Sequence, residues 1–468
     1  MTSVSFALRR CLSHRLLLPL SAAAALATLP ALPAGAADTS ATTLIETRLT
    51  DLVNADRARV GLPGLRIDVR LVAPARAWSA RMAASGSLAH DPDAAAANPA
   101  GVTTWAENVG RTSEADAAAA LHAGFMASAG HRSILLDGRF TDVGVGVARG
   151  GDAVYATQHF TGGAPARISG AVQATVDLAR ALFAGGGAQR AVIVRDDLFP
   201  DALAAGPLAG SLGPILLTPP GGVLYPPVRL ALEQFLPADA TVWIVGGNAA
   251  VDSDVEAELA AAGWRVRRVW GGDRVDTAAA VARAIADRDG RPDTALLATA
   301  GNWPDAAAGG GFGARTGSPV LLTYVDELPG ATAEALSAVA PRRVAVLGGA
   351  DVVSDGVVQR AGAERVDGLT RQDTAAAVAR DLWGRRDAAS APAWTVVPAD
   401  GQDAWTWALA AAPLAARLDA PILLGARPLS DGLRAYLDGL GYGEGRSALL
   451  HPFGPVGPAL DDLAALTR

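Results

Sequence analysis

The strongest constraint on this chain is that roughly its last 300 residues repeat themselves. Residues 275–283 return almost unchanged as residues 372–380, and residues 172–180 are a weaker copy. A Pro-Ile-Leu-Leu type of segment occurs in the same way at 213–218, 318–323 and 420–425. Self-similarity at a period of about 100 residues indicates one supersecondary unit present three times.

Within each unit, short apolar runs alternate with alanine-rich helical stretches; in the first unit the runs are 191–194, 214–217 and 241–245. This alternation predicts the α/β fold class, with a parallel sheet covered by helices on both faces. We expect Asp201 and Asp305 to cap the alanine-rich helices that follow them. Gly-Gly pairs follow the third run in the first two units, whereas Gly454-Pro455 stands in the third, which is therefore expected to be degenerate.

The amino terminus has the order of a secretory signal peptide. Arg9, Arg10 and Arg15 precede an apolar run over 16–34 and the small-residue triplet that ends at Ala36. The alternative is a retained membrane anchor, but three prolines interrupt the run. We expect cleavage after residue 36, by a general secretory or a twin-arginine route.

The cysteine content and the net charge exclude several kinds of site and partner. The only cysteine lies inside this leader, so the exported chain would contain no disulfide, thiolate nucleophile or cysteine-ligated metal. The net charge is −7 and the basic residues are all arginine. The charge argues against a nucleic-acid partner or a polybasic membrane surface, and no other apolar run suggests a transmembrane anchor.

Residues 42–162 combine helical periodicity with strand-like runs, and the Gly- and Pro-containing stretch 163–170 is typical of a linker. This first domain resembles the CAP superfamily, the fold of cysteine-rich secretory, antigen 5 and pathogenesis-related proteins, in its bacterial form. The matching segments are 52–59, 65–82, 88–90, 106–109, 130–135, 143–146 and 155–158. The resemblance implies an α-β-α sandwich.

The repeats resemble the cell-wall-binding repeat type 2 family, through their Pro-Ile-Leu-Leu, Gly-Gly and Asp-Ala segments. That resemblance implies three tandem parallel-sheet modules in a pseudo-threefold arrangement, over 171–270, 271–367 and 368–468. Such modules hold secreted proteins on bacterial envelopes. The expected partner is an anionic cell-wall glycopolymer.

The CAP resemblance places His90, Glu107 and His131 in one cavity. Two imidazoles and a carboxylate could bind a divalent metal such as zinc, or act as proton donor and acceptor. Ser128 stands where many relatives carry a second glutamate. The three residues could also be hydrogen-bonded groups that hold loops to the core.

Polymer attachment requires cations, which arginine alone supplies here. The candidates flank the repeat boundaries: Arg267, Arg268, Arg274, Arg365 and Arg371. Each of them could instead be an ordinary solvated charge. The polymer is expected beside Pro214, Pro319 and Pro421, whereas the Gly-rich run 309–313 lacks the context of a phosphate-binding loop.

These observations favour a secreted, noncovalently anchored protein that displays a CAP domain to a small ligand, metal or protein partner. A wall-anchored, protease-like hydrolase that uses His90, Glu107 and His131 is the alternative, and a purely adhesive spacer is a third possibility. We expect binding and display rather than catalysis. The ligand, the polymer and the oligomeric state are not encoded in any recognisable motif.

Overall fold

The computed structural model describes residues 34–98, 102–162, 170–183, 186–401, 403–443 and 446–468. Nearly all of the predicted signal peptide (1–36) and of the predicted linker (163–170) lies outside these ranges. Within the described ranges, none of the helices combines the length and the apolar character that a membrane crossing requires.

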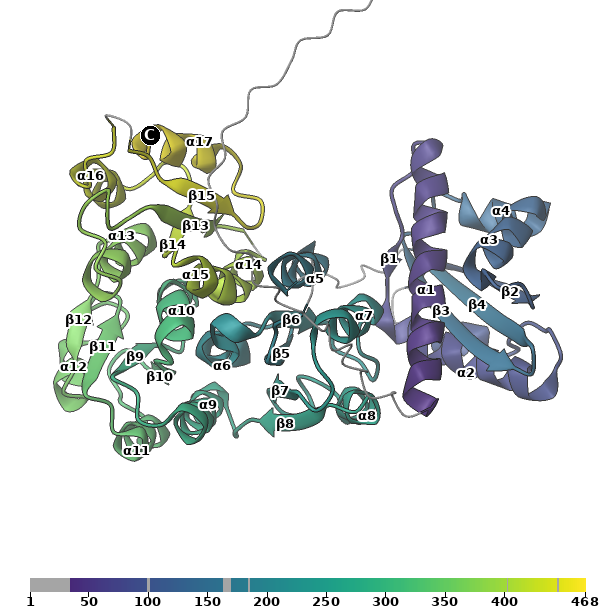
Figure 1. Ribbon diagram of the computed structural model, residues 1–468, viewed down its shortest axis with the longest axis horizontal. Coiled ribbons are helices and arrows are strands. Elements are labelled where there is room, and N and C mark those ends of the chain that lie inside the picture. Colours follow the sequence, from purple (N-terminus) through teal and green to yellow (C-terminus); the bar gives the residue numbers. More distant parts are fainter. Residues whose placement is uncertain (1–33, 99–101, 163–169, 184–185, 402, 444–445) are drawn as a thin grey trace, which may run out of the picture. The chain divides into compact units, whose positions relative to one another are not determined.

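The first domain is a four-stranded sheet between two helical layers (Figure 1). Its elements are α1 (Ala34–Arg59), β1 (Arg66–Ile67), α2 (Val69–Ser85), the 3-10 helix η1 (Ala94–Ala97), β2 (Thr104–Thr112), α3 (Ala117–Ala127), α4 (Ala129–Leu135), β3 (Asp142–Gly150) and β4 (Ala153–Gly162). The strand order is β1-β3-β4-β2, with β4 antiparallel to both of its neighbours. The predicted α-β-α sandwich is confirmed.

Strand β3 shows how the sequence builds this sandwich. Its valines alternate with glycines, and because strand side chains alternate between faces, all the valines point to one layer. Val143, Val145 and Val147 join the core formed by α1 and α3. On the opposite face, a Cβ atom on Gly146 would lie 2.0 Å from the Arg76 backbone nitrogen. The glycines therefore let α2 lie almost directly on the sheet.

The repeat region contains three sets of parallel strands with their helices, one set in each repeat. The first has α5 (Gly170–Phe183), β5 (Arg190–Arg195), η2 (Asp201–Ala204), α6 (Ala205–Ala209), η3 (Gly210–Leu212), β6 (Ile215–Thr218), α7 (Pro226–Phe235), β7 (Thr241–Val245), α8 (Ser253–Ala261) and β8 (Arg265–Val269). The second has α9 (Arg274–Asp289), β9 (Thr294–Thr299), α10 (Pro304–Thr316), β10 (Val320–Thr323), α11 (Gly330–Val339), β11 (Arg343–Leu347), α12 (Asp355–Arg360) and β12 (Glu364–Val366). The third has α13 (Arg371–Ala377), the π-helix η4 (Val378–Leu382), β13 (Ala393–Pro398), α14 (Ala404–Ala410), α15 (Ala412–Leu418), β14 (Ile422–Gly425), α16 (Asp431–Gly439), β15 (Leu449–Pro452) and α17 (Gly457–Leu466).

All three sheets are parallel and share one topology. Their strand orders are β6-β5-β7-β8, β10-β9-β11-β12 and β14-β13-β15. The third sheet has no fourth strand within the described residues, which agrees with the expected degeneracy. Gly454 nevertheless keeps the left-handed backbone of its counterparts Gly246 and Gly348, with a φ of 104°.

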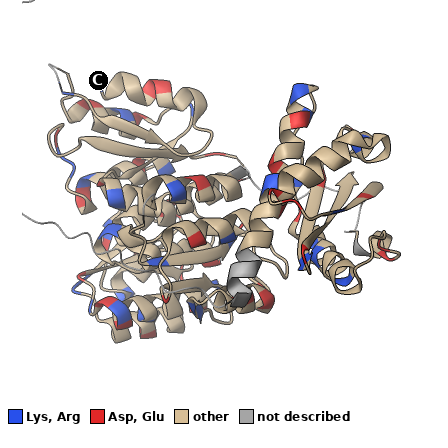
Figure 2. Ribbon diagram, turned by 45° about the vertical axis from the view of Figure 1, so that its right-hand side comes forward, with Lys and Arg blue, Asp and Glu red and all other residues tan. Residues whose placement is uncertain are grey.

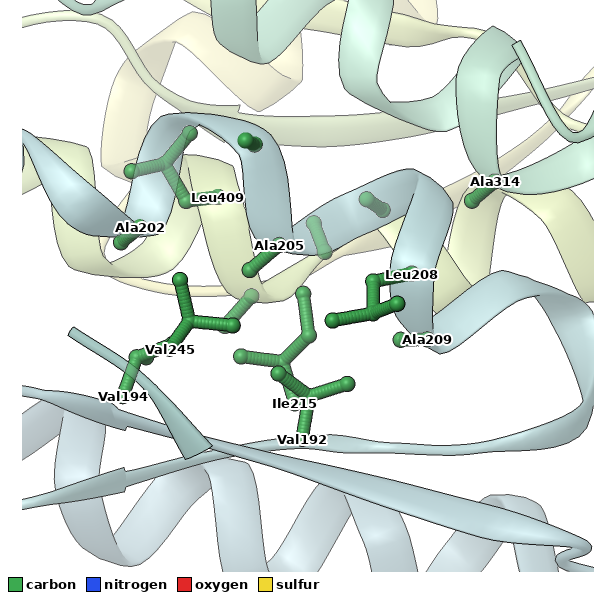
Figure 3. Close-up of a cluster of buried hydrophobic side chains, with 14 of the residues drawn as sticks. Val192, Val194, Ala202, Ala205, Leu208, Ala209, Ile215, Val245, Ala314 and Leu409 are labelled. Carbon is green, nitrogen blue, oxygen red and sulfur yellow. The ribbon is translucent and has the colours of Figure 1, made fainter. Parts of the chain in front are cut away.

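The three repeats share one apolar core. Helices α6, α10 and α15, each of which follows the first strand of its repeat, pack against one another in the middle of the repeat region (Figure 1). Figure 3 shows Ala314 of the second repeat and Leu409 of the third beside the buried side chains of the first. The predicted arrangement of three like modules around a common centre is confirmed.

Glycines make this centre possible. A Cβ atom on Gly206 would lie 2.9 Å from Cβ of Ala412 and 3.1 Å from the Gly310 carbonyl oxygen. Gly313 is similarly close to Pro207. The Gly-rich run of α10 is therefore a packing surface that brings helix backbones together.

We predict that Gly146→Ala destabilises the first domain by about 3 kcal/mol, because the new methyl group meets the α2 backbone and overpacks the layer. Gly124→Ala is the matched control, since Gly124 lies within α3 with open space around it. That change should raise the free energy of unfolding by about 1 kcal/mol through helix propensity. Urea unfolding measures both, and equal effects of the two substitutions would contradict the packing explanation.

Candidate functional site

The candidate site of the first domain is built on the pairing of β2 with β4. Glu107 on β2 lies directly opposite His159 on β4. Directly paired residues point to the same face, so the carboxylate and the imidazole are neighbours. Thr157 precedes His159 by two residues on β4, and its hydroxyl lies 2.9 Å from the Ser79 hydroxyl of α2. Because side chains alternate along a strand, His159 points to the same face of the sheet as Thr157, the face that α2 covers.

His90 and Glu107 form a direct pair. His90 Nδ1 lies 2.7 Å from Glu107 Oε1, and the Asp91 backbone amide donates to the same oxygen at 3.1 Å. The Glu107 side chain is 4% exposed, whereas the His90 side chain is 64% exposed. A buried carboxylate therefore orients a solvent-facing imidazole, and the ring nitrogen that does not bond to it remains available for a ligand.

His131 joins this group less directly. It lies in α4, and its ring packs edge-on against Phe125 with the centroids 5.3 Å apart. Burial and the proximity of His90 both lower the pKa of His131. Among the described residues, the His131 side chain forms no hydrogen bond with His90 or Glu107. The two histidines therefore interact by charge repulsion without direct contact through a hydrogen bond.

His159 was not among the expected site residues. It is only 2% exposed, and burial lowers its pKa. In the described part of the chain, His159 Nε2 and Glu107 Oε2 are buried without hydrogen-bond partners. Buried polar atoms are nearly always hydrogen-bonded in proteins, so these two atoms have hydrogen-bonding capacity that the described side chains do not use. Only the strand register could have revealed it.

The residues present do not fit the divalent metal centre that the CAP resemblance implies. Across the described ranges, no group of three or more His, Cys, Asp or Glu side chains is arranged to hold a metal ion. Glu107 Oε1 already accepts bonds from His90 and Asp91. Ser128 begins α4 and supplies no carboxylate.

In the repeats, two of the five candidate arginines have structural partners. Arg268 donates to the carbonyl oxygens of Gly246 at 3.0 Å and Val251 at 2.8 Å, and its counterpart Arg365 donates to those of Gly348 at 2.7 Å and Val353 at 2.8 Å. Arg268 also pairs with Glu256, and Arg365 pairs with Asp355. These guanidinium groups therefore hold the loops after β7 and β11.

Arg274 and Arg371 differ, because within the described residues each guanidinium group donates to a single backbone carbonyl. They stand at corresponding positions at the start of α9 and α13. Arg274 donates to the Ala300 carbonyl at 2.8 Å, and Arg371 donates to that of Ala399 at 2.9 Å. The side chain of Arg371 also reaches Asp400 at 3.5 Å, yet it is 40% exposed. Each guanidinium has five N–H donors, so most of them remain free to bind.

Arg371 lines a crevice of about 380 Å³ at the carboxyl ends of the second repeat's strands, together with Asp305, Asp367 and Thr374. The expectation that Asp201 and Asp305 cap helices is wrong, since Pro200 and Trp303 occupy those positions. Asp305 instead hydrogen-bonds with Thr374 of the next repeat, and burial raises its pKa. In open α/β sheets, ligands bind in such crevices.

The three candidate prolines are buried, so they cannot contact a polymer themselves. The carbonyl oxygens of Pro214, Pro319 and Pro421 accept the ladder hydrogen bonds of Val192, Leu296 and Thr395. They mark the start of the second strand in every repeat. The leucines that follow them are core residues, as expected.

Comparison with known proteins decides the family. The profile of Cell wall binding domain 2 (CWB2) matches residues 167–256, 268–358 and 365–440, which is more than half of the chain. The chain belongs to the CWB2 family. A second profile, of the Cysteine-rich secretory protein family, matches residues 50–161, so a CAP domain precedes three CWB2 repeats. The chain is therefore a cell-wall-associated protein.

Two curated relatives come from Bacillus subtilis (strain 168). The chain is 31% identical to an amidase enhancer over 196 residues, 41% of this chain and 26% of that protein. It is 29% identical to N-acetylmuramoyl-L-alanine amidase LytC over 42% of this chain and 38% of that protein. The chain thus spans only about a quarter to two fifths of these relatives. Among solved structures, Cwp8 from Clostridium difficile is similar, with a TM-score of 0.55 and 26% identity over 64% of this chain and 50% of that one.

The lowered pKa values of His159 and His131 predict a pH-dependent stability of the CAP domain. Because the folded state resists protonation, the unfolded state binds more protons as the pH falls through the ordinary histidine range near 6.5, and stability falls with it. His159→Gln should therefore reduce the difference in free energy of unfolding between pH 7.5 and pH 5.5. Urea unfolding at the two pH values measures this; an unchanged difference in the variant would contradict the assignment.

Proposed function

We propose that this protein is secreted, is held noncovalently on the bacterial wall by its three CWB2 repeats, and displays a CAP domain that binds a small ligand or a protein partner. The observation that supports anchoring best is the presence of three wall-binding repeats around one shared core. The partner proposed for the repeats is an anionic cell-wall glycopolymer.

Arg274 and Arg371 carry the polymer contact in this proposal. Both guanidinium groups are fixed by one carbonyl each, so little side-chain entropy is lost when an anion binds. Planar guanidinium groups suit phosphate and carboxylate oxygens, which they can bind with two parallel hydrogen bonds. Their repetition at two junctions gives the repeat region two similar contact points for one extended polymer.

The charge distribution of the repeats implies that they bind an anionic polymer through short-range contacts. Figure 2 shows arginines and acidic residues interspersed along the helices of the repeats, without a face of a single sign in this view. The chain as a whole is negative. Long-range attraction to an anionic wall is therefore absent, and binding depends on short-range contacts at particular arginines.

The CAP site supports ligand binding in this proposal. The unpartnered Glu107 Oε2 and His159 Nε2 atoms can each form a hydrogen bond to a polar guest, and the exposed imidazole of His90 lies beside Glu107. A small polar molecule or a polar side chain of a partner protein would satisfy these atoms.

One observation favours the alternative, a wall-anchored hydrolase. The His90 and Glu107 pair has the geometry of a general base with its orienting carboxylate. Across the described residues, however, no serine or threonine hydroxyl bonds to His90 or His131, so an attacking water would have to serve as nucleophile. This is why binding and display is the function that we propose.

Replacing both Arg274 and Arg371 by Gln should lower the amount of protein retained on purified walls at least tenfold, because two charge-assisted contacts are lost. Arg342→Gln is the control at an exposed arginine. Within the described residues Arg342 pairs with the exposed Asp293, so this variant should retain wild-type binding. Cosedimentation with walls at increasing salt measures retention. Equal retention of the double variant and the control would contradict the polymer contact.

A further inference from the structure

The first repeat has a hollow of about 420 Å³. It lies toward the amino ends of the strands, whereas the crevice beside Arg371 lies at the carboxyl ends of the second repeat's strands. The hollow is lined by Arg190 at the amino end of β5, by Thr241 and Trp243 of β7, by Arg267 in the middle of β8 and by the last turns of α9. The charged residues that line it are Arg190, Arg267, Arg288 and Asp287. Three arginines against one aspartate make the lining cationic.

The three arginines are held differently. Arg288 is fixed, because it donates to the Leu208 carbonyl at 2.6 Å and pairs with Asp289. Arg267 lies over the Trp243 ring, 5.7 Å from its centroid. Across the described residues, no hydrogen bond or ion pair involves the side chain of Arg190 or of Arg267. Their donors are therefore available.

Arg190 has the strongest need of a counterion. It is partly buried, and burial together with the nearby charge of Arg288 lowers its pKa. A desolvated cation beside another cation is unfavourable unless an anion accompanies it. Asp289, which pairs with Arg288, and the exposed Asp287 at the edge of the hollow offset this charge only in part.

We propose that this hollow is an anion-binding subsite, in which Arg190 and Arg267 together bind one phosphate or carboxylate group of the wall polymer. The proposal rests on the wall-anchoring function and adds a place and a chemical class of ligand to it. Arg288 and Trp243 position the site, since Arg288 closes one side and Trp243 supports the Arg267 guanidinium.

The other repeats lack this site, which makes it distinct from the contacts at Arg274 and Arg371. Strand register places Thr294 and Glu364 of the second repeat where Arg190 and Arg267 stand in the first. Trp243 is likewise replaced by Ala345. The third repeat has Ala393 at the position of Arg190. The first repeat alone therefore has this pair of arginines, and in the second repeat Glu364 is paired with Arg343, the counterpart of Thr241.

The test uses the full chain and titrates it with inorganic phosphate and, separately, with acetate at constant ionic strength. Calorimetry should show anion binding in the wild type, and Arg267→Glu, which introduces the residue found in the second repeat, should weaken the site formed by Arg190 and Arg267 at least tenfold. Binding that remains in Arg267→Glu is expected at Arg274 and Arg371, the other two proposed contacts. Arg190→Gln should do the same, and circular dichroism checks its folding. Asp287→Asn should tighten binding about twofold, because the competing carboxylate is removed. Tighter phosphate than acetate binding would identify phosphate as the group, and the reverse would identify carboxylate.

Arg342→Gln and Arg342→Glu lose the same charge as Arg190→Gln and Arg267→Glu respectively; they are the controls and should leave anion binding unchanged. Absence of anion binding in the wild type, or equal affinities of the wild type and Arg267→Glu, would overturn the subsite. Wall cosedimentation of the same proteins separates the two proposals. If the walls retain the wild type and Arg267→Glu equally, anchoring stands and the subsite fails; if they do not retain the wild type, the anchoring function itself fails.

Discussion

The close approach of three helices controls the architecture of the repeat region. Helices α6, α10 and α15 contact one another through glycine and alanine residues. Their backbones are so close that the contacts at several glycines leave no room for a methyl group. A larger residue at Gly206 or Gly313 would separate the repeats. Because this centre belongs to one continuous apolar core, each repeat needs the other two to cover its central helix. The third repeat takes part in this core although its sheet has one strand fewer within the described residues.

The CAP domain uses the same device in another form. Glycines on β3 bring α2 onto the sheet, and a hydrogen-bonded carboxylate locks the contact. Glu46 accepts from the Val147 amide at 3.0 Å and pairs with Arg76 at 2.7 Å. The rigid sheet then holds Glu107 and His159 opposite each other with one unpartnered polar atom each. Strands that are so tightly packed fix the positions of these side chains.

Several features could be predicted from the sequence because they depend on local pattern or on repetition. The alternation of apolar runs and alanine-rich stretches predicts the parallel sheets, and the valine-glycine alternation of 143–147 belongs to a strand as expected. The site was predictable only where the CAP resemblance supplied it, at His90, Glu107 and His131. His159 was missed because its burial follows from the pairing of β2 with β4, which no local pattern reveals.

The polar assignments failed for the same reason. Arg268 and Arg365 looked like free cations at the repeat boundaries, but their partners are backbone carbonyls brought near by the turn after the preceding strand. Asp305 resembled a helix cap, whereas its partner Thr374 lies in the next repeat. Long-range partners decide the role of a polar side chain, and a single sequence does not state them.

The central claim is that the repeats hold the protein on the wall while the CAP domain is displayed. Its most direct measurement is the location of the protein in cells of the source organism that produce either the full chain or the chain without residues 168–468. The account predicts that the full chain fractionates with the wall and is removed by high salt, whereas the truncated protein is found in the medium. A truncated protein that remains on the envelope would contradict it.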